Sequence, residues 1–355
     1  MIGKKLYITG GIGARHEGES FGDNYELPDL TAYCETCAAI GSVYWNHRMF
    51  LLTGEAKYFD VLERTLYNGL IAGISTEGTT FFYPNPLESD GKFAFNHGSC
   101  TRQSWFDCSC CPTNLIRFIP AIPGLIYAQD QDTVFVNLYA SNSATFGIRN
   151  TDVRISQLTN YPWEGKILVK IEPETAKNFT LKFRIPYWAR NVAVPGDLYA
   201  YTDDEHDSVK ITVNGVTIKT RLDQEYIEIT RKWERGDSVL MIFPMEIKRT
   251  ITNWNVQPNH NKVALEYGPL VYCAEETDNG NHLSEIILPD TSVYNIVFRK
   301  DLFGGINTIV GEAHYGITHH KKECIEETGL SAILIPYYLW SNRGIGKMKV
   351  WFPRE

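Results

Sequence analysis

Residues 133–146 read TVFVNLYASNSATF, a run whose apolar and polar side chains alternate with a period near two. Such alternation is typical of a β-strand that buries one face. Asn214-Gly215, between Val213 and Val216, is a favoured hairpin turn. We therefore predict an antiparallel β-sandwich over residues 128–245. Its further alternating segments are ILVKIEPE (167–174), FTLKFRIPYW (179–188), VKITVNG (209–215), YIEITRKW (226–233) and SVLMIFPMEIKRT (238–250).

The chain beyond this region keeps the same strand-like pattern. Its alternating segments are KVALEYGPLVYCAE (262–275), EIILPD (285–290), YNIVFRK (294–300) and KMKVWFPRE (347–355). Turn residues separate them, as in an all-β domain. We predict a second β-sandwich over residues 246–355, with a last strand that could return to the first.

The region before residue 128 has a helical period instead. Gly54 suits the end of the first predicted helix, Pro112 suits the first turn of the third, and Pro120 and Pro123 predict a kink there. Residues 74–109 are expected to form a long loop, and such loops in compact domains are usually functional. The fold class is therefore mixed α and β, with several domains. The helices are expected over residues 32–52, 56–73 and 112–127.

The composition narrows the class of protein. The 355 residues suggest two or three domains, and 43% hydrophobic residues suffice for a buried core. A net charge of −8 argues against a nucleic-acid partner, which requires an excess of Lys and Arg. No apolar run is long enough to predict a membrane span, and the N-terminus lacks the apolar stretch of a secretion signal. We therefore expect a cytoplasmic protein with no membrane partner.

The cysteines are concentrated in the helical region. Six of the eight lie between residues 34 and 111, mainly in the strings Cys34-Glu35-Thr36-Cys37 and Cys108-Ser109-Cys110-Cys111-Pro112. In a chain without a secretion signal, such a cluster indicates metal binding or catalysis rather than disulfides. Zinc prefers thiolate, imidazole and carboxylate ligands in a tetrahedral arrangement, so zinc is the expected cofactor.

The residues alone leave the ligand set open. An all-cysteine set would be a structural zinc site, but its two C-x-x-C pairs are much farther apart than in ordinary zinc ribbons. A mixed set requires the segment at Glu35 to be extended or just entering the helix, because residues i and i+2 of a helix point to nearly opposite faces. Buried cysteines without a metal are the third possibility. The all-cysteine set is Cys34, Cys37, Cys108 and Cys111, and the mixed set is Glu35, Cys37, Cys110 and Cys111.

Two further residues could carry chemistry. Cys110 comes just before the helix at Pro112, where backbone N–H dipoles lower the pKa of a thiol, so it is a candidate nucleophile. Glu19 lies in a glycine-rich acidic loop; it could protonate a leaving group from a cleft, or the loop could simply be solvated. The histidines of this region, His16, His47 and His97, have no telling sequence context.

At these residues the sequence resembles glycoside hydrolase family 127, the β-L-arabinofuranosidases. The Cys-x-Cys-Cys-Pro-x-Asn string is highly specific, and the resemblance covers essentially the whole chain. The strings that carry it are Gly18-Glu19-Ser20-Phe21, Tyr33-Cys34-Glu35-Thr36-Cys37, WFDCSCCPTN (105–114), YGPLVY (267–272) and IPYYLWSNRGIGKMKVW (335–351).

The resemblance implies a catalytic zinc site rather than a purely structural one. Cys110 would be the nucleophile, Glu19 the general acid/base, and Tyr83 a residue that contacts the sugar. The implied enzyme is a retaining glycoside hydrolase that releases L-arabinofuranose-type sugars from β-linkages in an oligosaccharide or glycoside. The implied zinc ligands are Glu35, Cys37, Cys110 and Cys111.

The resemblance also has implications for the architecture. Residues 1–127 would be the C-terminal part of a helical (α/α)6 barrel that carries the site, because family members have further helices before this point. A homodimer through the β domains is a further expectation. The alternative function is a non-catalytic fragment, or a carbohydrate-binding module with a structural zinc site.

Overall fold

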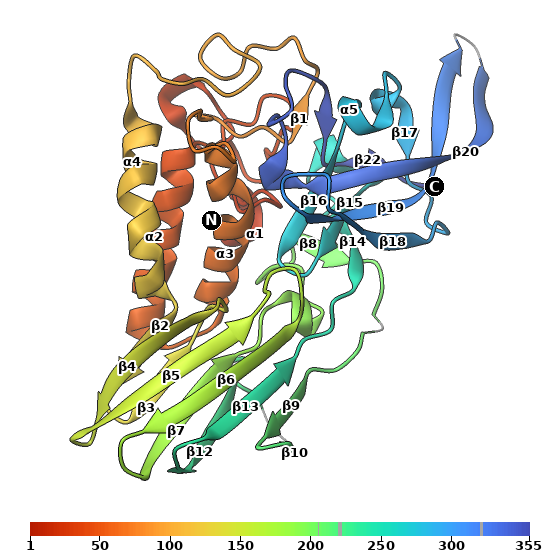
Figure 1. The fold of residues 1–355 in the computed structure, drawn as a ribbon. Helices are drawn as coiled ribbons and strands as arrows, with labels where there is room; N and C mark the ends of the chain where they lie inside the picture. Colours follow the sequence, from red (N-terminus) through yellow and green to blue (C-terminus); the bar gives the residue numbers. More distant parts are fainter. Residues whose placement is uncertain (205, 219–221, 320–321) are drawn as a thin grey trace.

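The computed structural model describes residues 1–204, 206–218, 222–319 and 322–355. Figure 1 shows three regions in chain order: helices with long loops, a sandwich of two sheets, and a curled C-terminal sheet. The chain is therefore a mixed α and β multidomain protein, as the sequence predicts. Within the described residues, no helix has the length and apolar character needed to cross a membrane.

The helical region is built on two neighbouring helices, α2 (Thr36–Thr53) and α3 (Lys57–Thr65), with α4 (Cys110–Phe118) against α2 (Figure 1). α2 ends as predicted, because Gly54 takes a left-handed φ of 71° and its N–H bonds to Phe50 O. The further short elements of this region are α1 (Ile2–Lys5), η1 (Glu17–Glu19) and β1 (Glu88–Ser89).

The second predicted helix reaches its predicted end at Gly73, but only its first part is α-helical. α3 continues after Thr65 as a π turn, η2 (Leu66–Leu70), and a 3-10 turn, η3 (Ile71–Gly73). α4 begins at Cys110 rather than at residue 112 and gives way to a 3-10 segment, η4 (Ile119–Leu125). This segment contains both predicted kink prolines, whose missing N–H groups interrupt the α-helical bonding.

The middle region is a sandwich of two sheets. Its strands are β2 (Tyr127–Asp130), β3 (Thr133–Val136), β4 (Asn142–Ile148), β5 (Thr151–Thr159), β6 (Lys166–Pro173), β7 (Lys177–Arg184), β9 (Lys210–Val213), β10 (Val216–Thr217), β11 (Leu222–Asp223), β12 (Tyr226–Trp233) and β13 (Asp237–Ile242), with the turn η5 (Trp188–Arg190). One sheet has the order β11-β12-β7-β3-β2 and the other β10-β9-β13-β6-β5-β4.

The two sheets of the sandwich share one core. Val134 and Leu181 of the first sheet and Ile155 and Val169 of the second are fully buried in the same cluster. The pairings among the described strands are antiparallel, as predicted, apart from β3 with β7, which run parallel. The predicted Asn214-Gly215 hairpin is confirmed, since both residues have positive φ and join β9 to β10.

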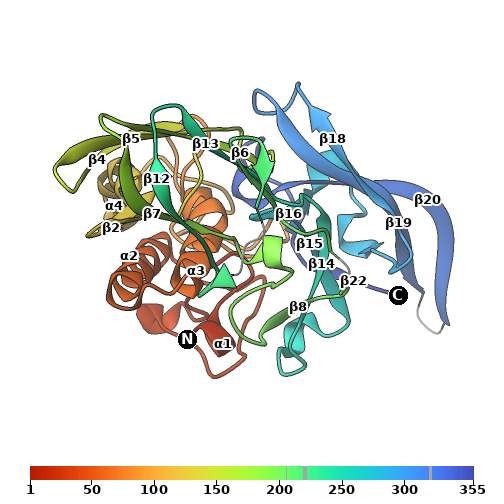
Figure 2. The ribbon, with the colours of Figure 1, turned by 90° about the horizontal axis from the view of Figure 1, so that it is seen from below.

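The C-terminal region is one curled sheet rather than the predicted second sandwich, and its main strand order is β17-β19-β20-β16-β15-β14-β8. Its elements are β8 (Tyr199–Tyr201), β14 (Ile247–Thr252), η6 (Gln257–Asn259), β15 (Lys262–Tyr267), β16 (Leu270–Glu275), α5 (Glu276–Asn279), η7 (Leu283–Glu285), β17 (Ile286–Ile287), β18 (Tyr294–Arg299), β19 (Ile306–His319), β20 (Lys322–Pro336), η8 (Tyr337–Leu339), β21 (Met348–Lys349) and β22 (Phe352–Pro353). β22 pairs with β15, and β21 pairs with both β16 and β1. Seen from below, this sheet lies beside the helices and the sandwich (Figure 2).

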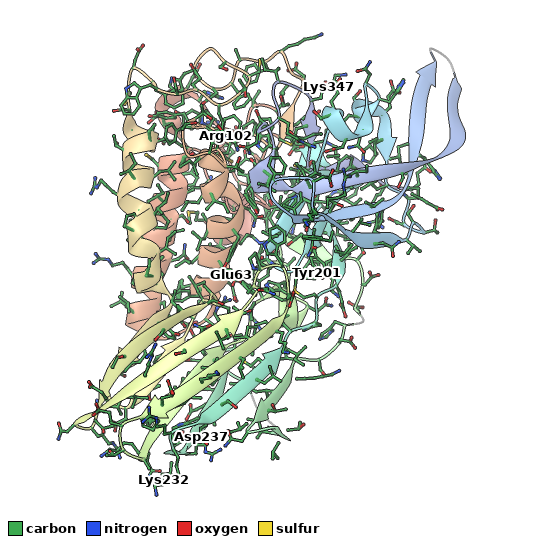
Figure 3. The ribbon with its side chains drawn as sticks, in the orientation of Figure 1. Glu63, Arg102, Tyr201, Lys232, Asp237 and Lys347 are labelled. Atoms are coloured by element: carbon green, nitrogen blue, oxygen red, sulfur yellow. The ribbon has the colours of Figure 1, made fainter. Side chains whose placement is uncertain are left out.

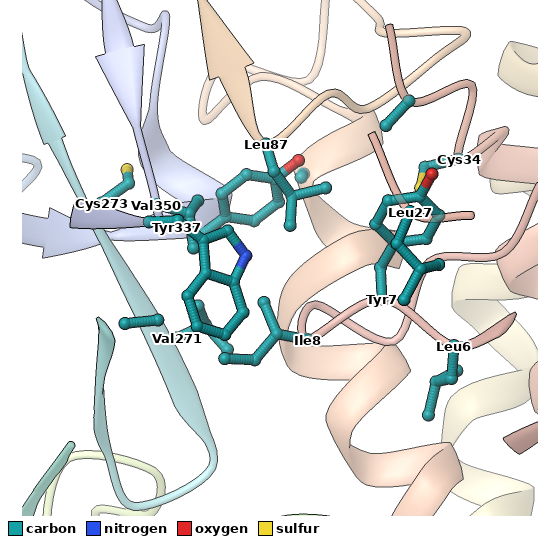
Figure 4. Packing of buried hydrophobic residues seen from close by; sticks show 14 of the residues in the cluster. Leu6, Tyr7, Ile8, Leu27, Cys34, Leu87, Val271, Cys273, Tyr337 and Val350 are labelled. Atoms are coloured by element: carbon teal, nitrogen blue, oxygen red, sulfur yellow. The ribbon is translucent and has the colours of Figure 1, made fainter. Parts of the chain in front are cut away.

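The N-terminal segment packs into the C-terminal region. Tyr7 and Ile8 are buried in one hydrophobic cluster with Val271, Tyr337 and Val350, and Figure 4 shows these side chains gathered between the two regions. The helical region and the curled sheet therefore share a core, and neither buries its apolar surface without the other.

Buried ion pairs connect α3 to both β regions. Arg184 of β7 bonds to Asp60 at 2.8 Å and to Glu63 at 2.6 Å, while Arg64 bonds to Glu266 of β15 at 2.7 Å. All five side chains are at most 1% exposed. Figure 3 shows Glu63 near the junction between the helices and the sandwich. Such pairs stay favourable only while both partners are in place, so they fix the orientation of α3.

Candidate metal centre and active site

The four residues of the mixed ligand set converge where α2 and α4 begin. Glu35 immediately precedes α2 and Cys37 is its second residue, while Cys110 and Cys111 are the first two residues of α4. Their ligand atoms all lie within 4.8 Å of one another. Cys37 Sγ is 2.8 Å from Cys110 Sγ, and the sulfur atoms of Cys110 and Cys111 are each 3.5 Å from Glu35 Oε1. Two distant stretches of sequence thus form one compact donor set.

The backbone before α2 explains how Glu35 and Cys37 can face the same point. Glu35 is extended, with φ −59° and ψ 137°, and the helix starts only after it. The preceding residue, Cys34, has a left-handed φ of 39° and places its side chain in the core shared with the C-terminal region. Cys108 is exposed. The structure therefore assembles the mixed set and not the all-cysteine set.

The groups of this cluster shift one another's ionisation. A hydrogen bond with Cys111, and a second with Cys110, lower the pKa of Cys37 to about 7. Burial and the hydrogen bond with Cys37 raise the pKa of Cys110 to about 12, and the bond with Cys37 raises that of Cys111 further. Burial raises the pKa of Glu35. The protein alone therefore favours a thiolate at Cys37, because each additional anion would be repelled by the first.

The donor set fits a zinc ion. Three sulfur atoms and one carboxylate oxygen are ligands that zinc accepts, and bonds of roughly 2.3 Å to sulfur place tetrahedral donors about 3.8 Å apart. The separations between donor atoms in the cluster run from 2.8 Å to at most 4.8 Å and so include this value. A divalent cation would also offset the charge of several thiolates at once. Asn114 adds a hydrogen bond to Cys37, an outer contact that the sequence analysis did not single out.

Glu19 lies beside the cluster in a bent turn. The backbone is left-handed at Gly18, with φ 67°, and at Glu19, with φ 48°, which is uncommon for a residue other than glycine. Tyr33 OH donates a hydrogen bond to Glu19 Oε1 at 2.8 Å, and Tyr33 itself is buried. Glu19 also contributes to the raised pKa of Glu35. Its carboxylate is thus exposed but oriented, as a proton-transferring group requires.

Tyr83 lies next to the sulfur of Cys110. Its hydroxyl hydrogen-bonds to that sulfur, an interaction that lowers the pKa of Cys110 against the larger effect of burial. The backbone of Tyr83 is held by Asn96 Oδ1, 2.8 Å from Tyr83 N, and by Thr36 N, 2.9 Å from Tyr83 O. Glu19, Tyr83 and the four residues of the mixed ligand set therefore lie around one centre.

Two histidines without a telling sequence context also lie at this centre. The His16 ring meets Tyr33 edge-on at 4.7 Å between centroids, and the His97 ring lies 4.4 Å from Tyr83. Burial and the nearby His97 lower the pKa of His16, which favours its neutral form. His47 instead contacts Phe59 of α3, away from the cluster. Sequence reasoning missed His16 and His97 because only the fold brings them to the tyrosines.

Arg102 anchors the loop of residues 74–109 to the C-terminal region. The residue is 6% exposed, and its guanidinium donates to Ala72 O at 2.8 Å and to Trp340 O at 2.6 Å and lies 4.2 Å from the centre of the Phe82 ring. Burial lowers its pKa to about 10. Figure 3 places Arg102 at the loop end of the helices. The C-terminal region thus helps to position the loop that carries Tyr83.

Family models match the chain in three consecutive blocks. Residues 1–124 match the β-L-arabinofuranosidase GH127 catalytic domain, residues 133–245 the GH127 middle domain, and residues 247–353 the glycoside hydrolase family 127 C-terminal domain. The cysteine cluster and Glu19 lie in the block that matches the catalytic domain.

Individual relatives show the same similarity. A non-reducing end β-L-arabinofuranosidase of Bifidobacterium longum subsp. longum is 32% identical over 372 residues, covering 99% of this chain and 53% of that protein. A solved GH127 β-arabinofuranosidase gives a TM-score of 0.94 at 47% identity, covering 100% of this chain and 54% of that chain. A GH127 β-L-arabinofuranosidase from Geobacillus stearothermophilus T6 gives 0.90 at 38% identity, covering 99% and 55%. The chain spans about half the length of these relatives.

Proposed function

The chain belongs to glycoside hydrolase family 127, and from this premise we propose that it acts as a retaining glycosidase that releases L-arabinofuranose-type sugars from β-linkages. The observation that carries the proposal is the meeting of three cysteines and Glu35 at the starts of α2 and α4, with Glu19 beside them. The relatives named as β-L-arabinofuranosidases support the choice of sugar.

The proposed reaction is a double displacement. The sulfur of Cys110 attacks the anomeric carbon while Glu19 donates a proton to the glycosidic oxygen, and the aglycone leaves as an alcohol. Glu19, now ionised, removes a proton from a water molecule whose oxygen displaces the sulfur from the anomeric carbon. The sugar leaves with its configuration retained after two inversions, and both side chains return to their starting states.

The surrounding residues support these two roles. Glu35, Cys37, Cys110 and Cys111 would hold zinc, which when bound supplies the positive charge that keeps the thiols ionised at neutral pH. Tyr83 donates a hydrogen bond to the Cys110 sulfur, which orients the nucleophile.

On the acid/base side, Tyr33 holds one oxygen of Glu19, and the exposure of Glu19 allows its carboxyl group to face a substrate. The contacts of the neutral His16 ring with Tyr33 fix that tyrosine in turn.

We further propose that residues 1–127 form part of an (α/α)6 barrel, followed by two β domains over residues 128–245 and 246–355. Large apolar side chains on one stripe of α2 are exposed, including Trp45 at 63% and Leu52 at 79%, and Ile116 of α4 is exposed at 63%. The other helices of such a barrel would cover this surface, whether they come from the same polypeptide or from a partner. A cytoplasmic location and a homodimer through the β domains stay predictions.

A matched pair of cysteine variants tests the proposed function. Cys110→Ser should abolish hydrolysis of an aryl β-L-arabinofuranoside, while Cys108→Ser, at an exposed position outside the cluster, should retain it. Zinc content is measured on all three proteins after dialysis. A wild-type protein that holds zinc and sugar but hydrolyses nothing would support the alternative, a binding module with a structural zinc site.

A further inference from the structure

A cavity of about 490 Å³ opens where the middle sandwich meets the curled C-terminal sheet. The turn between β5 and β6 forms one wall, and β18 with the start of β19 forms the other. Clefts between domains are frequent ligand sites. The lining residues that matter here are Asn160, Trp163, Glu164, Phe298, Gly305 and Asn307, none of which belongs to the candidate active site.

One wall presents an aromatic ring that is both fixed and exposed. Phe298 is 63% exposed, although it pairs across the sheet with Asn307 in a regular register. The ring lies directly against Gly305: a Cβ atom there would come within 2.7 Å of it. Gly305, with a φ of 121°, is therefore what allows the ring to occupy this position. A large apolar ring held in place at a cavity wall offers a flat surface to a ligand.

The other groups of the cavity are hydrogen-bonding amides and a carboxylate. Asn160 Nδ2 donates to Glu164 Oε1 at 3.0 Å, and Asn307 Nδ2 donates to Trp163 O at 3.3 Å, which joins the two domains. Within the described part of the chain, these bonds leave Glu164 Oε2 and Asn307 Oδ1 able to accept hydrogen bonds from a ligand.

The chemistry of the lining selects one ligand class. Among the residues that the structure describes, the lining includes no lysine or arginine and its single charge, on Glu164, is negative, so phosphate and carboxylate ligands are disfavoured. One carboxylate is too few for a divalent cation, which takes several oxygen ligands. Acceptors for hydroxyl groups next to an aromatic face suit a neutral sugar, whose ring has an apolar C–H side and a hydroxylated edge.

We propose that this cavity is an accessory subsite that binds a neutral sugar unit of a glycan. The sugar ring stacks on Phe298, and its hydroxyl groups donate to Glu164 and Asn307. This assignment comes from the lining alone and does not require that the chain hydrolyses anything. The subsite holds a second part of the same glycan, or a neighbouring chain, away from Cys110 and Glu19.

Affinity electrophoresis through gels that contain soluble arabinan tests the subsite. Phe298→Ala should weaken the retardation of the protein with an increase in Kd of about tenfold, as expected when an anchoring ring is truncated. Trp254→Ala is the matched control. Trp254 lies in the loop before η6, is 78% exposed, and stacks on His260 outside the cavity. This variant should bind arabinan like the wild type.

A second, isosteric variant and a hydrolysis assay keep the result interpretable. Glu164→Gln preserves the side-chain shape and should also weaken binding, while cleavage of a small aryl glycoside should be unchanged in both cavity variants. Equal retardation of wild type, Phe298→Ala and Glu164→Gln would overturn the proposal, as would a wild-type protein that arabinan does not retard. Retardation by polyphosphate instead of arabinan would overturn the neutral-sugar assignment.

Discussion

Glu19 and Glu17 are separated by one glycine, yet they differ in backbone conformation and in hydrogen bonding. Glu19 has a left-handed φ of 48° and accepts a hydrogen bond from the hydroxyl of the buried Tyr33. Strained backbone at a site is maintained only where surrounding contacts compensate for it, and here Tyr33 supplies such a contact. At the residue scale, the assignment of the acid/base therefore depends on one hydrogen bond and one backbone angle.

Glu19→Gln should lower the rate of hydrolysis by about 10²–10⁴, the usual contribution of a general acid/base. The amide keeps the shape and the contact with Tyr33 but cannot transfer the proton. Initial rates on an aryl β-L-arabinofuranoside measure the effect. Glu17→Gln, in the same turn, is the control and should change the rate less than about twofold. An equal loss in both variants would contradict the role of Glu19.

At this scale, the sequence was most informative where the candidate residues are adjacent in the chain. Through a family resemblance, the strings Glu35-Thr36-Cys37 and Cys110-Cys111-Pro112 indicated the four residues that the structure brings together, although spacing alone left two ligand sets open. The choice between them required the extended backbone at Glu35, which sits at a helix boundary and which propensity does not determine. His16 and His97 were missed because each contacts a tyrosine that is well separated from it in the sequence, His16 contacting Tyr33 and His97 contacting Tyr83.

At the element scale, α3 is the helix on which the three regions meet. Asp60 and Glu63 bond to Arg184 of the sandwich, and Arg64, the next residue, bonds to Glu266 of the curled sheet. Consecutive helical residues point in different directions, so one short helix can reach two neighbours at once. The amphipathic pattern predicted the helix, but its buried charges look like surface positions in sequence and gave no sign of their partners.

Arg184→Ala should lower the free energy of unfolding by about 3–5 kcal/mol, because it leaves Glu63 buried without a counter-charge and leaves Asp60 with Arg190 as its remaining partner. Chemical denaturation followed by circular dichroism measures the change. Arg149→Ala removes an ion pair with Asp132 whose partners are 56% and 33% exposed, and it should cost less than about 1 kcal/mol. Similar losses of unfolding free energy in the two variants would show that burial does not make the Arg184 ion pairs more important to stability than an exposed pair.

At the scale of the whole molecule, the N-terminal segment and the C-terminal sheet complete each other. Tyr7 and Ile8 share a core with residues more than 260 positions away, and β21 pairs with β1. The alternating pattern predicted the strands of both β regions. It could not predict this closure, because period-two patterning fixes which face is buried but not which distant element covers it.

Asp29 lies where the N-terminal segment meets the C-terminal sheet, and it makes the free energy of unfolding depend on pH. Asn259 Nδ2 is 3.2 Å from Asp29 Oδ1 and Lys262 Nζ is 3.5 Å from Asp29 Oδ2, yet burial dominates and raises the pKa of Asp29 to about 6. A carboxyl with a higher pKa in the folded state binds more protons when folded. The free energy of unfolding therefore falls as pH rises from about 4 to about 6.

The contribution of Asp29 over that window should be on the order of 2 kcal/mol. Urea unfolding at several pH values measures it. Asp29→Asn keeps an acceptor for Asn259 but does not titrate, so its unfolding free energy should vary less with pH than that of the wild type. An unchanged pH profile in the variant would assign the dependence to other groups.

The most direct test of the account is to find the sugar on its nucleophile. The protein is mixed with an aryl β-L-arabinofuranoside, quenched in acid during turnover and digested for peptide mass spectrometry. We predict that the peptide containing Cys110 gains the mass of one anhydropentose and that Cys110→Ser abolishes the gain. A pentose on a different residue, or hydrolysis with inverted configuration and no adduct, would contradict a cysteine nucleophile.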